Sequence, residues 1–328
     1  MARHWFIPFA SVALFSCSLV FAASRTEPPS GAIVVPNDYP TIQAAVDSLS
    51  DSEHGVIFIH SGTYKEQVYI ARNGGLTIYG ETEDTSDYQN NKVTITNGLD
   101  AGAAGSNDAS GTLRVHSDNV AIYNIDIVNS YGAGSQAIAV SQYGSKVGFY
   151  GCGLYGYQDT LLANVGTQVY LKGYIEGATD FIFGQQASAY FGGNTLAVRG
   201  KGWITAHGRN SDDGGSYVFN KNTIVLASNA DSNAEGNFYL GRPWREYAKV
   251  IFMNTDVQAK INPALWSVWN KGDERTGHVT FADYATTGSG ASSLSRASFA
   301  TELSKEEYSI STCVGSDYAD WVDAEYFV

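Results

Sequence analysis

The feature that most constrains the fold is a loose repeat of short apolar segments between residues 120 and 257. Their starts are 27, 22, 20, 28 and 33 residues apart, and each carries an aromatic or aliphatic residue two places after its start. The segments are VAIYNIDI from Val120, VGFYGCGL from Val147, VYLKGYIE from Val169, AYFGGNTL from Ala189, YVFNKNTI from Tyr217 and VIFMNTDV from Val250. A single unit of this kind cannot bury its apolar side, whereas stacked units can.

Short strands at this period, with no helical pattern between them, predict an all-β fold, a parallel β-helix. No linker divides residues 31–328, so we expect one domain. The alternative is a β-sandwich, which would show Asn-Gly or Asp-Gly hairpin signals every ~8–12 residues; few are present. Short terminal helices are expected over residues 42–49, where the apolar residues have helical spacing, and over residues 298–310, covering one end of the stack.

The N-terminus has the pattern of a secretory signal peptide. Arg3 and His4 precede a mostly apolar run from Trp5 to Leu14, and small residues follow it. We expect residues 1–22 to form the signal peptide, with cleavage between about residues 17 and 23, and the mature protein to be secreted and extracellular. No other stretch reaches the ~18 apolar residues of a membrane span.

The charge and the cysteines limit the possible partners and cross-links. The formal net charge is -13 and there is no run of Lys or Arg. Because binding to phosphate or anionic lipid needs a basic patch, we expect no nucleic-acid and no membrane partner. We also expect a monomeric protein. Cys152 and Cys313 remain after signal cleavage as either one disulfide or two buried thiols, with free thiols the preferred expectation.

Amide and carboxylate side chains recur at the period of the repeat. Gln136 lies 22 residues before Gln158, and Asp180 lies 21 residues after Asp159. If one coil takes about that length, these side chains lie on successive coils, ~4.8 Å apart. Solenoids also stack such residues for hydrogen bonding alone. Two stacked carboxylates, however, repel each other unless one is protonated or a cation intervenes, so the pair indicates a functional site.

The stretch LGRPWREY, residues 240–247, supplies a cation and an aromatic ring. An Arg beside an Asp lowers the pKa of the Asp and can orient it by a bidentate contact, which is the expected role of Arg242. Trp244 would be a platform for a sugar ring. The alternative for this stretch is a surface ion pair and a core Trp. Of Trp266 and Trp269, we expect one in the core and the other along a groove.

Five motifs follow one another in the chain: GTYKE (62–66), QAIAV (136–140), GYQDTL (156–161), DFIFG (180–184) and LGRPW (240–244). In these motifs, and in the later INPALWSVW and ADY, the chain resembles the pectin methylesterases, with the length and simple architecture of the fungal type. The resemblance covers nearly all of residues 33–285. It implies a right-handed parallel β-helix, no cofactor and no metal, and hydrolysis of the C6 methyl esters of pectin (methylated homogalacturonan) with release of methanol.

The resemblance also implies roles for individual residues. Asp180 would be the nucleophile, Asp159 the general acid and base, and Gln136 and Gln158 the donors to the oxyanion, with Arg242 as the fifth catalytic residue. Substrate contacts are implied for Gln136, Arg242, Trp244, Phe183, Tyr157, Trp269 and Thr112.

Other functions would need different features. A polygalacturonase-type glycoside hydrolase is the alternative enzyme, because retaining glycosidases also place two carboxylates ~5 Å apart, but its paired-Asp, Gly-His-Gly and Arg-Ile-Lys motifs are absent. A β-helical pectate lyase would need a Ca²⁺ cluster. A solenoid that only binds polysaccharide through Trp would not need the aspartates to stack.

The chain has no G-x-S-x-G motif that would carry a catalytic serine. His207 is therefore expected to be structural and not a member of a catalytic triad.

Overall fold

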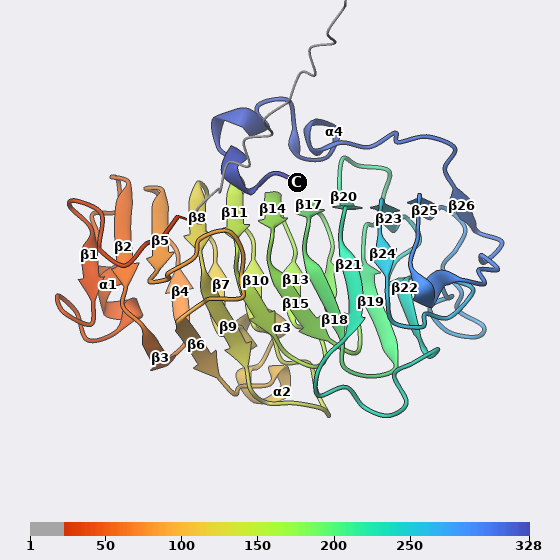
Figure 1. The fold of residues 1–328 in the computed structure, drawn as a ribbon, viewed down its shortest axis with the longest axis horizontal. Coiled ribbons are helices and arrows are strands. Elements are labelled where there is room, and N and C mark those ends of the chain that lie inside the picture. Colours follow the sequence, from red (N-terminus) through yellow and green to blue (C-terminus); the bar gives the residue numbers. More distant parts are fainter. Residues whose placement is uncertain (1–22) are drawn as a thin grey trace, which may run out of the picture.

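The computed structural model describes residues 23–328, so the predicted signal peptide, residues 1–22, lies outside the described residues. The described chain winds through three sheets, to which successive coils add strands one after another (Figure 1). The ladders between the named strands are parallel, and parallel crossovers are right-handed for steric reasons. The predicted right-handed parallel β-helix is therefore confirmed, and the β-sandwich alternative is wrong.

The bounds of the strands follow the order of each sheet along the stack. The first sheet contains β1 (Ile33–Val35), β2 (Gly55–Ile59), β5 (Leu76–Gly80), β8 (Val120–Tyr123), β11 (Val147–Tyr150), β14 (Thr167–Leu171), β17 (Ser188–Gly192), β20 (Ser216–Asn220), β23 (Lys249–Met253), β25 (Thr280–Tyr284) and β26 (Ala300–Glu302). The second contains β4 (Val68–Ile70), β7 (Leu113–Val115), β10 (Val140–Gln142), β13 (Leu161–Ala163), β16 (Ile182–Gly184), β19 (Gly202–His207) and β22 (Phe238–Pro243). The third contains β3 (Gly62–Lys65), β6 (Val93–Asn97), β9 (Ile125–Asn129), β12 (Gly153–Tyr155), β15 (Tyr174–Gly177), β18 (Thr195–Val198), β21 (Thr223–Leu226) and β24 (Asp256–Val257).

The repeated segments form the aromatic centre of the core. Phe149, Tyr170, Phe191, Phe219 and Phe252 are in register on successive strands of the first sheet, and their ring centroids are 5.1, 4.8, 4.3 and 4.1 Å apart. Stacked rings of this kind contribute about 0.5–1.5 kcal/mol per pair beyond the area they bury. The third segment is shifted by one residue from the predicted alignment, because Tyr170, and not the residue after it, pairs with Phe149.

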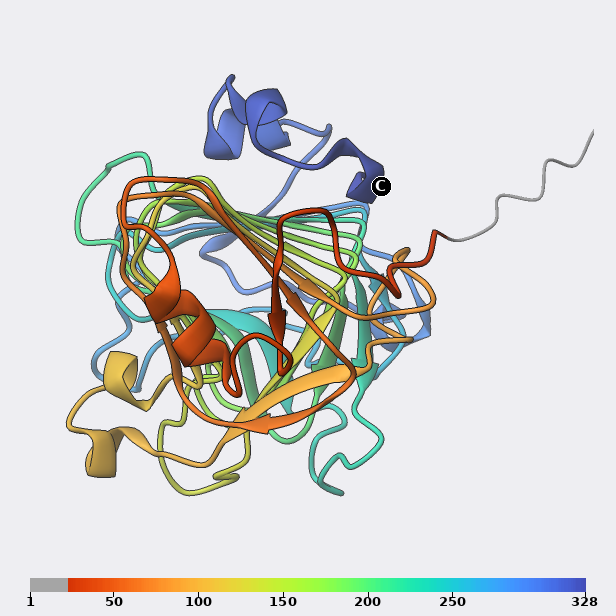
Figure 2. The same ribbon diagram turned by 90° about the vertical axis from the view of Figure 1, so that its left-hand side faces the viewer.

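The predicted N-terminal helix is confirmed as α1 (Ile42–Ser48). The Thr41 hydroxyl accepts a hydrogen bond from the Ala44 amide, and the Glu66 carboxylate accepts from the amides of Ile42 and Gln43, so the first turn is capped. The apolar side of α1 packs into the main core. Figure 2 shows α1 at the N-terminal end of the stacked coils.

The prediction of a helix over residues 298–310 is wrong. Residues 300–302 form β26, which extends the first sheet beyond β25, and the next helix, α4 (Ile310–Val314), begins only after the Ser309 cap. The C-terminal segment, with η2 (Tyr318–Asp320) and η3 (Ala324–Tyr326), packs on the outer side of the first sheet instead of covering an end (Figure 1). Cys313 is buried there and Cys152 in the main core, and both are free thiols.

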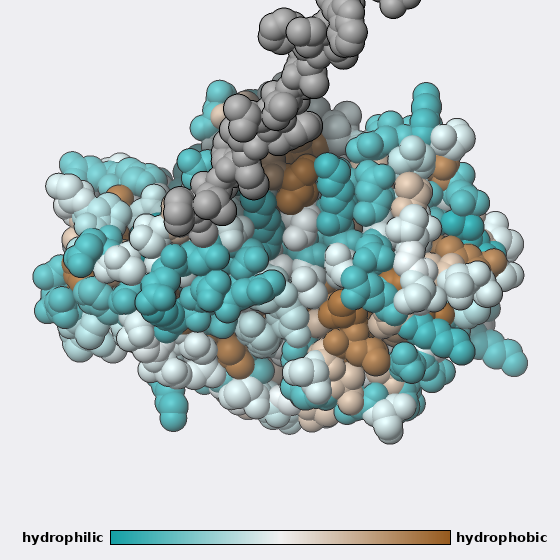
Figure 3. All heavy atoms as spheres, viewed as in Figure 1, coloured by the Kyte–Doolittle hydropathy of each residue, from teal (hydrophilic) through white to brown (hydrophobic). Residues whose placement is uncertain are grey.

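The remaining short helices lie in loops and at the C-terminal end of the stack: α2 (Ala101–Ala104), α3 (Asn107–Ser110) and η1 (Ser289–Ala291). Within residues 23–328, no helix has the length and apolar character needed to cross a membrane. Hydrophilic residues cover most of the face seen in Figure 3, with only small hydrophobic areas between them.

Candidate active site

A cavity of about 280 Å³ lies on the outer side of the second sheet and gathers most of the predicted site residues. It is lined by Asn107, Gln136, Gln158, Asp159, Asp180, Phe183, Ala206, Arg242, Trp244 and Trp269. These residues come from the starts of β13 and β16, from β19 and β22, and from loops. The spacing of the motifs thus brings the predicted carboxylates, carboxamides, cation and two of the tryptophans into one place.

Asp159 and Asp180 lie on adjacent coils, as predicted. Leu161 pairs with Ile182, and Gln158 forms a bridge with Thr179, so the ladder has an offset of 21 residues that places one aspartate beside the other. Both aspartates have left-handed backbone conformations, with φ of 64° and 50°. Such backbone is uncommon for residues other than glycine, and in this chain it recurs at turns of other coils, for example at Asn124, Lys146 and Lys172.

Arg242 holds Asp180 by two hydrogen bonds. Its Nε donates to Oδ1 at 2.9 Å and its Nη2 donates to Oδ2 at 2.6 Å. This is the bidentate geometry that matches a guanidinium to a carboxylate, and it fixes the orientation of the carboxylate as well as its charge. The contact joins β22 to the start of β16, across the intervening strand β19. The alternative of a surface ion pair is wrong, because both side chains are largely buried.

Two indole rings stack against the Arg242 guanidinium. Its central carbon lies 3.6 Å from the ring centroid of Trp203 and 4.1 Å from that of Trp269. The Trp203 Nε1 donates to the Ser267 hydroxyl at 2.6 Å, which fixes that ring in turn. Cation–π contacts of this kind restrict the guanidinium to one plane. Trp203 did not figure among the predicted site residues, because nothing in its own segment marks it.

Burial raises the pKa of both aspartates. For Asp159 the pKa lies well above the usual range, because burial and the neighbouring charge of Asp180 both disfavour its ionised form. For Asp180 burial also raises the pKa, against the opposing effect of Arg242. The expected lowering of the Asp180 pKa is therefore wrong in direction, because desolvation exceeds the contribution of the ion pair. Asp180 remains the more readily ionised of the two, since Arg242 bonds it directly.

Gln136 and Gln158 present their carboxamides to the cavity. Neither side chain makes a hydrogen bond to another residue in the described part of the chain, so their N–H groups are available to a ligand. The Ala137 amide donates to the Gln158 carbonyl at 3.1 Å. The ladder offset between β10 and β13 is 21 residues, so Gln136 is one residue out of register with Gln158, contrary to the predicted equivalence.

Of the two tryptophans Trp266 and Trp269, one lies in the core and the other lines the cavity, as expected. Trp266 is only 1% exposed and stacks on Phe281 in the core, whereas Trp269 lines the cavity. Trp244 and Phe183 form another part of the wall, with ring centroids 6.1 Å apart. The alternative of a core position for Trp244 is wrong, because its ring is only partly buried.

Two of the predicted substrate contacts lie elsewhere. Thr112 is fully buried and its hydroxyl donates to the Val128 carbonyl, so the prediction that it contacts substrate is wrong. Tyr157 lies outside the cavity, where its hydroxyl donates to Asp231 at 2.5 Å. Asn107 and Ala206 line the cavity without having been predicted, because neither belongs to a motif.

His207 is structural, as expected. It is fully buried, its Nδ1 accepts a hydrogen bond from the Lys249 amide, and burial lowers its pKa to about 3. In residues 23–328, no group of three or more His, Cys, Asp or Glu side chains has an arrangement that could hold a metal ion.

Comparisons with known proteins match almost the whole chain. The family model described as Pectinesterase matches residues 32–314. A pectinesterase from Aspergillus aculeatus is 47% identical over 327 residues, covering 96% of this chain and 98% of that protein. One from Aspergillus niger is 47% identical over 316 residues, covering 93% and 95%. A crystal structure of the pectin methylesterase from Aspergillus niger has a TM-score of 0.86 and 41% identity, covering 93% of this chain and 100% of that one. The matched residues include the whole cavity.

Proposed function

Because this chain belongs to the pectinesterase family and removes methyl esters from pectin, we propose that Asp180 is the nucleophile and Asp159 the general acid and base of that hydrolysis. The observation that carries the assignment is the bidentate contact of Arg242 with Asp180 alone. It favours the ionised form of Asp180, while burial and the neighbouring charge of Asp180 favour the protonated form of Asp159. A carboxylate nucleophile and a carboxylic acid are the two groups that ester cleavage requires here.

The first half of the reaction forms an acyl-enzyme. The Asp180 carboxylate attacks the carbonyl carbon of the ester, and the carbonyl oxygen takes the negative charge in the tetrahedral intermediate. The N–H groups of Gln136 and Gln158 donate to that oxygen. When the intermediate collapses, the C–O bond to the methoxy group breaks and Asp159 transfers its proton to it, which releases methanol.

The second half restores the enzyme. Asp159, now ionised, takes a proton from a water molecule as that water attacks the acyl carbonyl. The new tetrahedral intermediate collapses and the bond to Asp180 breaks, which restores the Asp180 carboxylate. The product departs as a carboxylic acid and loses its proton to the solvent. Trp244, Phe183 and Trp269 form the apolar wall along the sugar chain. We propose methylated homogalacturonan as the polymer and a monomer as the working unit, acting outside the cell after removal of residues 1–22.

Product analysis separates this function from glycoside hydrolysis. On methylated pectin, we expect methanol in proportion to new carboxylates and no new reducing ends. New reducing ends would support the glycosidase alternative, which the closeness of Asp159 and Asp180 does not by itself exclude.

The activity is expected to have a bell-shaped pH profile. It rises as Asp180 loses its proton and falls as Asp159 loses its own, and the two apparent pKa values belong to the coupled pair. Since burial raises the pKa of both groups, the acid limb should lie above the ordinary aspartate value of 3.8. The measurement is kcat and kcat/KM for methanol release from about pH 3 to pH 9. Activity that keeps climbing beyond about pH 8 would contradict the role of Asp159.

Trp203→Leu is expected to lower kcat about tenfold, because a cation–π contact contributes ~0.5–2 kcal/mol and here orients the Arg242 guanidinium. The acid limb of the pH profile should move to higher pH, since a less well-held Arg242 stabilises the ionised form of Asp180 less. Trp203→Phe keeps a ring in place and should restore most of the activity. A variant with lower kcat and an unmoved acid limb would show that Trp203 supports the fold only.

A further inference from the structure

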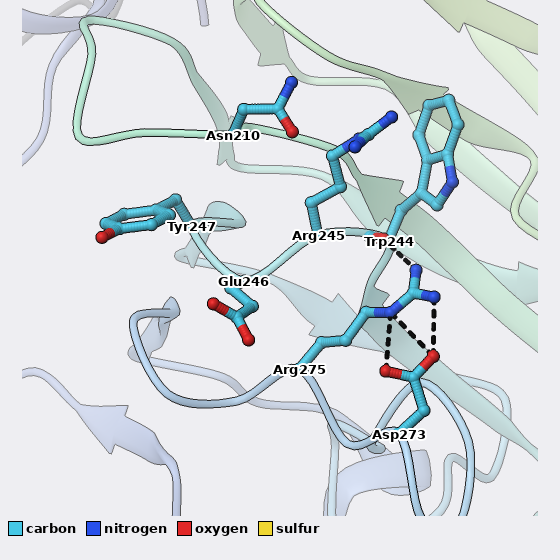
Figure 4. Close-up of a pocket in the computed structure, with 7 residues that line it drawn as sticks. All are labelled: Asn210, Trp244, Arg245, Glu246, Tyr247, Asp273 and Arg275. Carbon is cyan, nitrogen blue, oxygen red and sulfur yellow. Dashed lines mark hydrogen bonds and ion pairs between the residues drawn. The ribbon is translucent and has the colours of Figure 1, made fainter.

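A cavity that takes no part in the proposed reaction lies on the outer side of the third sheet. The cavity of about 440 Å³ that adjoins the catalytic one shares Trp244 with it, so the two belong to one surface groove (Figure 4). The cavity on the third sheet, of about 420 Å³, shares no lining residue with either of them and extends over β6, β9, β12 and β15. We call it the third-sheet cavity. Its volume is within the ~300–1,000 Å³ of sites that bind small molecules.

The pleat of the third sheet explains which side chains reach this cavity. Ile127 and Leu154 are buried in the main core, so their neighbours along the strands point outward. On the outer side, Val128, Tyr155 and Glu176 pair in one row across β9, β12 and β15. The row therefore presents an apolar side chain, an aromatic ring and a carboxylate, with ~4.8 Å between successive strands.

The Tyr155 ring lies over Gly153, which precedes it by two residues and has no side chain. A Cβ at Gly153 would come within 2.5 Å of Tyr155 Cε2 and within 2.4 Å of Asp126 Oδ1. Glycine inside a strand commonly marks such a close approach. Asp126 pairs with Gly153 on one neighbouring strand, and Glu176 pairs with Tyr155 on the other. The aromatic ring is therefore flanked by a carboxylate on each side.

The two carboxylates keep hydrogen-bonding capacity for a ligand. The Asn91 side-chain amide donates to Asp126 Oδ1 at 2.9 Å, and the Tyr174 hydroxyl donates to Glu176 Oε2 at 2.7 Å. Glu176 Oε1 lies 3.5 Å from Arg199 Nε, and within residues 23–328 no hydrogen bond reaches this oxygen. The carboxylates stand two strands, ~10 Å, apart, so they suit two separate hydroxyl groups better than one metal ion.

The charge of the cavity disfavours acidic ligands. Burial raises the pKa of Asp126 to about 6, so at neutral pH Asp126 and Glu176 place two negative charges against the single positive charge of Arg199. Arg199 Nη1 already donates to the Gly156 carbonyl at 3.3 Å, and its guanidinium lies 5.3 Å from the Tyr157 ring. A galacturonate carboxylate would be repelled here. This repulsion separates the third-sheet cavity chemically from the catalytic one.

We propose that the third-sheet cavity binds a neutral sugar unit of a cell-wall polysaccharide, with the sugar ring against Tyr155 and its hydroxyl groups donating to Asp126 and Glu176. A pyranose has an apolar C–H face and a rim of hydroxyl groups, and the cavity presents an aromatic ring between two carboxylates, which are strong acceptors. Thr94 and Asn229 add neutral hydrogen-bonding groups to the wall. The site would hold the enzyme to uncharged parts of the wall while the acidic polymer occupies the catalytic cavity.

The test is saturation-transfer NMR at about pH 7 with three neutral β-1,4-linked tetrasaccharides, of galactose, xylose and glucose. At least one should bind, and an excess of hexagalacturonate, an acidic ligand for the catalytic cavity, should not displace it. Glu176→Gln should weaken this binding about tenfold, because the acceptor loses its charge. Tyr155→Leu should weaken it several-fold, because the aromatic face is lost. Neither variant should change kcat/KM on soluble methylated homogalacturonan.

Glu81→Gln and Tyr308→Leu are the matched controls. Glu81 also contacts a cationic side chain, His60, at 2.9 Å, and Tyr308 packs with the C-terminal segment on the first sheet; neither lines the third-sheet cavity. Both should bind the sugar like wild type. Binding of none of the three tetrasaccharides would overturn the proposal, and so would displacement by hexagalacturonate or unchanged binding in Glu176→Gln. If Tyr155→Leu does not fold, as its melting curve will show, Glu176→Gln decides alone.

Discussion

Asp180→Asn is expected to lower kcat for methanol release by about a thousandfold or more, with the fold intact. An amide at this position cannot attack the ester carbonyl, and its contact with Arg242 loses one of the two charges. Asp159→Asn should also be severe, because departing methanol then has no proton donor. The measurement is kcat on methylated pectin, together with the melting temperature of each variant.

A matched control is available far from the cavity. Asp283 is fully buried and bound by Arg296 through two hydrogen bonds of 2.8 Å, the same arrangement as Asp180 with Arg242. Asp283→Asn should therefore cost stability without a specific loss of kcat. If Asp180→Asn kept more than about a tenth of the wild-type kcat, a barrier change of only ~1.4 kcal/mol, Asp180 would not be the nucleophile.

Gln158→Ala is expected to lower kcat by ~10²–10³-fold while KM changes little, because a donor to the oxyanion acts mainly in the transition state. Gln158 is half-buried beside Asp159, so water replaces its N–H groups poorly. Gln136→Ala should act in the same direction but less strongly, since Gln136 is exposed and water can enter more easily.

Gln186→Ala is the control for these glutamines, because Gln186 is exposed after β16 and does not line the catalytic cavity. Its kcat should match that of wild type. A raised KM with an unchanged kcat in Gln158→Ala would show that Gln158 binds the substrate without stabilising the oxyanion.

Much of the site could be predicted because the sequence separation of its polar residues equals the length of one coil of the solenoid. Asp159 and Asp180 are one ladder offset apart, and any parallel β-helix with that period places them side by side. The same argument was less accurate for Gln136, which is one residue out of register with Gln158. Ladder positions are fixed by backbone pairing, but the residues just before a strand belong to loops, whose lengths vary from coil to coil.

Trp203 and Asn107 could not be predicted in this way. The ladder between β19 and β22 joins Ala206 to Arg242, an offset of 36 residues, because a long loop intervenes. No regular period connects Trp203 with Arg242, so their stacking depends on the path of that loop. Asn107 comes from a short helix inserted between β6 and β7, and no periodic pattern places it.

The sequence by itself therefore determined the solenoid, the juxtaposition of the two aspartates and the presence of a cation and aromatic rings, because the coil period is visible in the sequence and parallel pairing then places residues one period apart side by side. Only the tertiary structure decided the sign of the Asp180 pKa shift, since burial of that carboxyl outweighs the Arg242 contact. It also decided that the Arg242 guanidinium stacks against both Trp203 and Trp269. Desolvation and ion pairing depend on every group that surrounds a side chain, and those groups come from coils and loops far apart in the sequence.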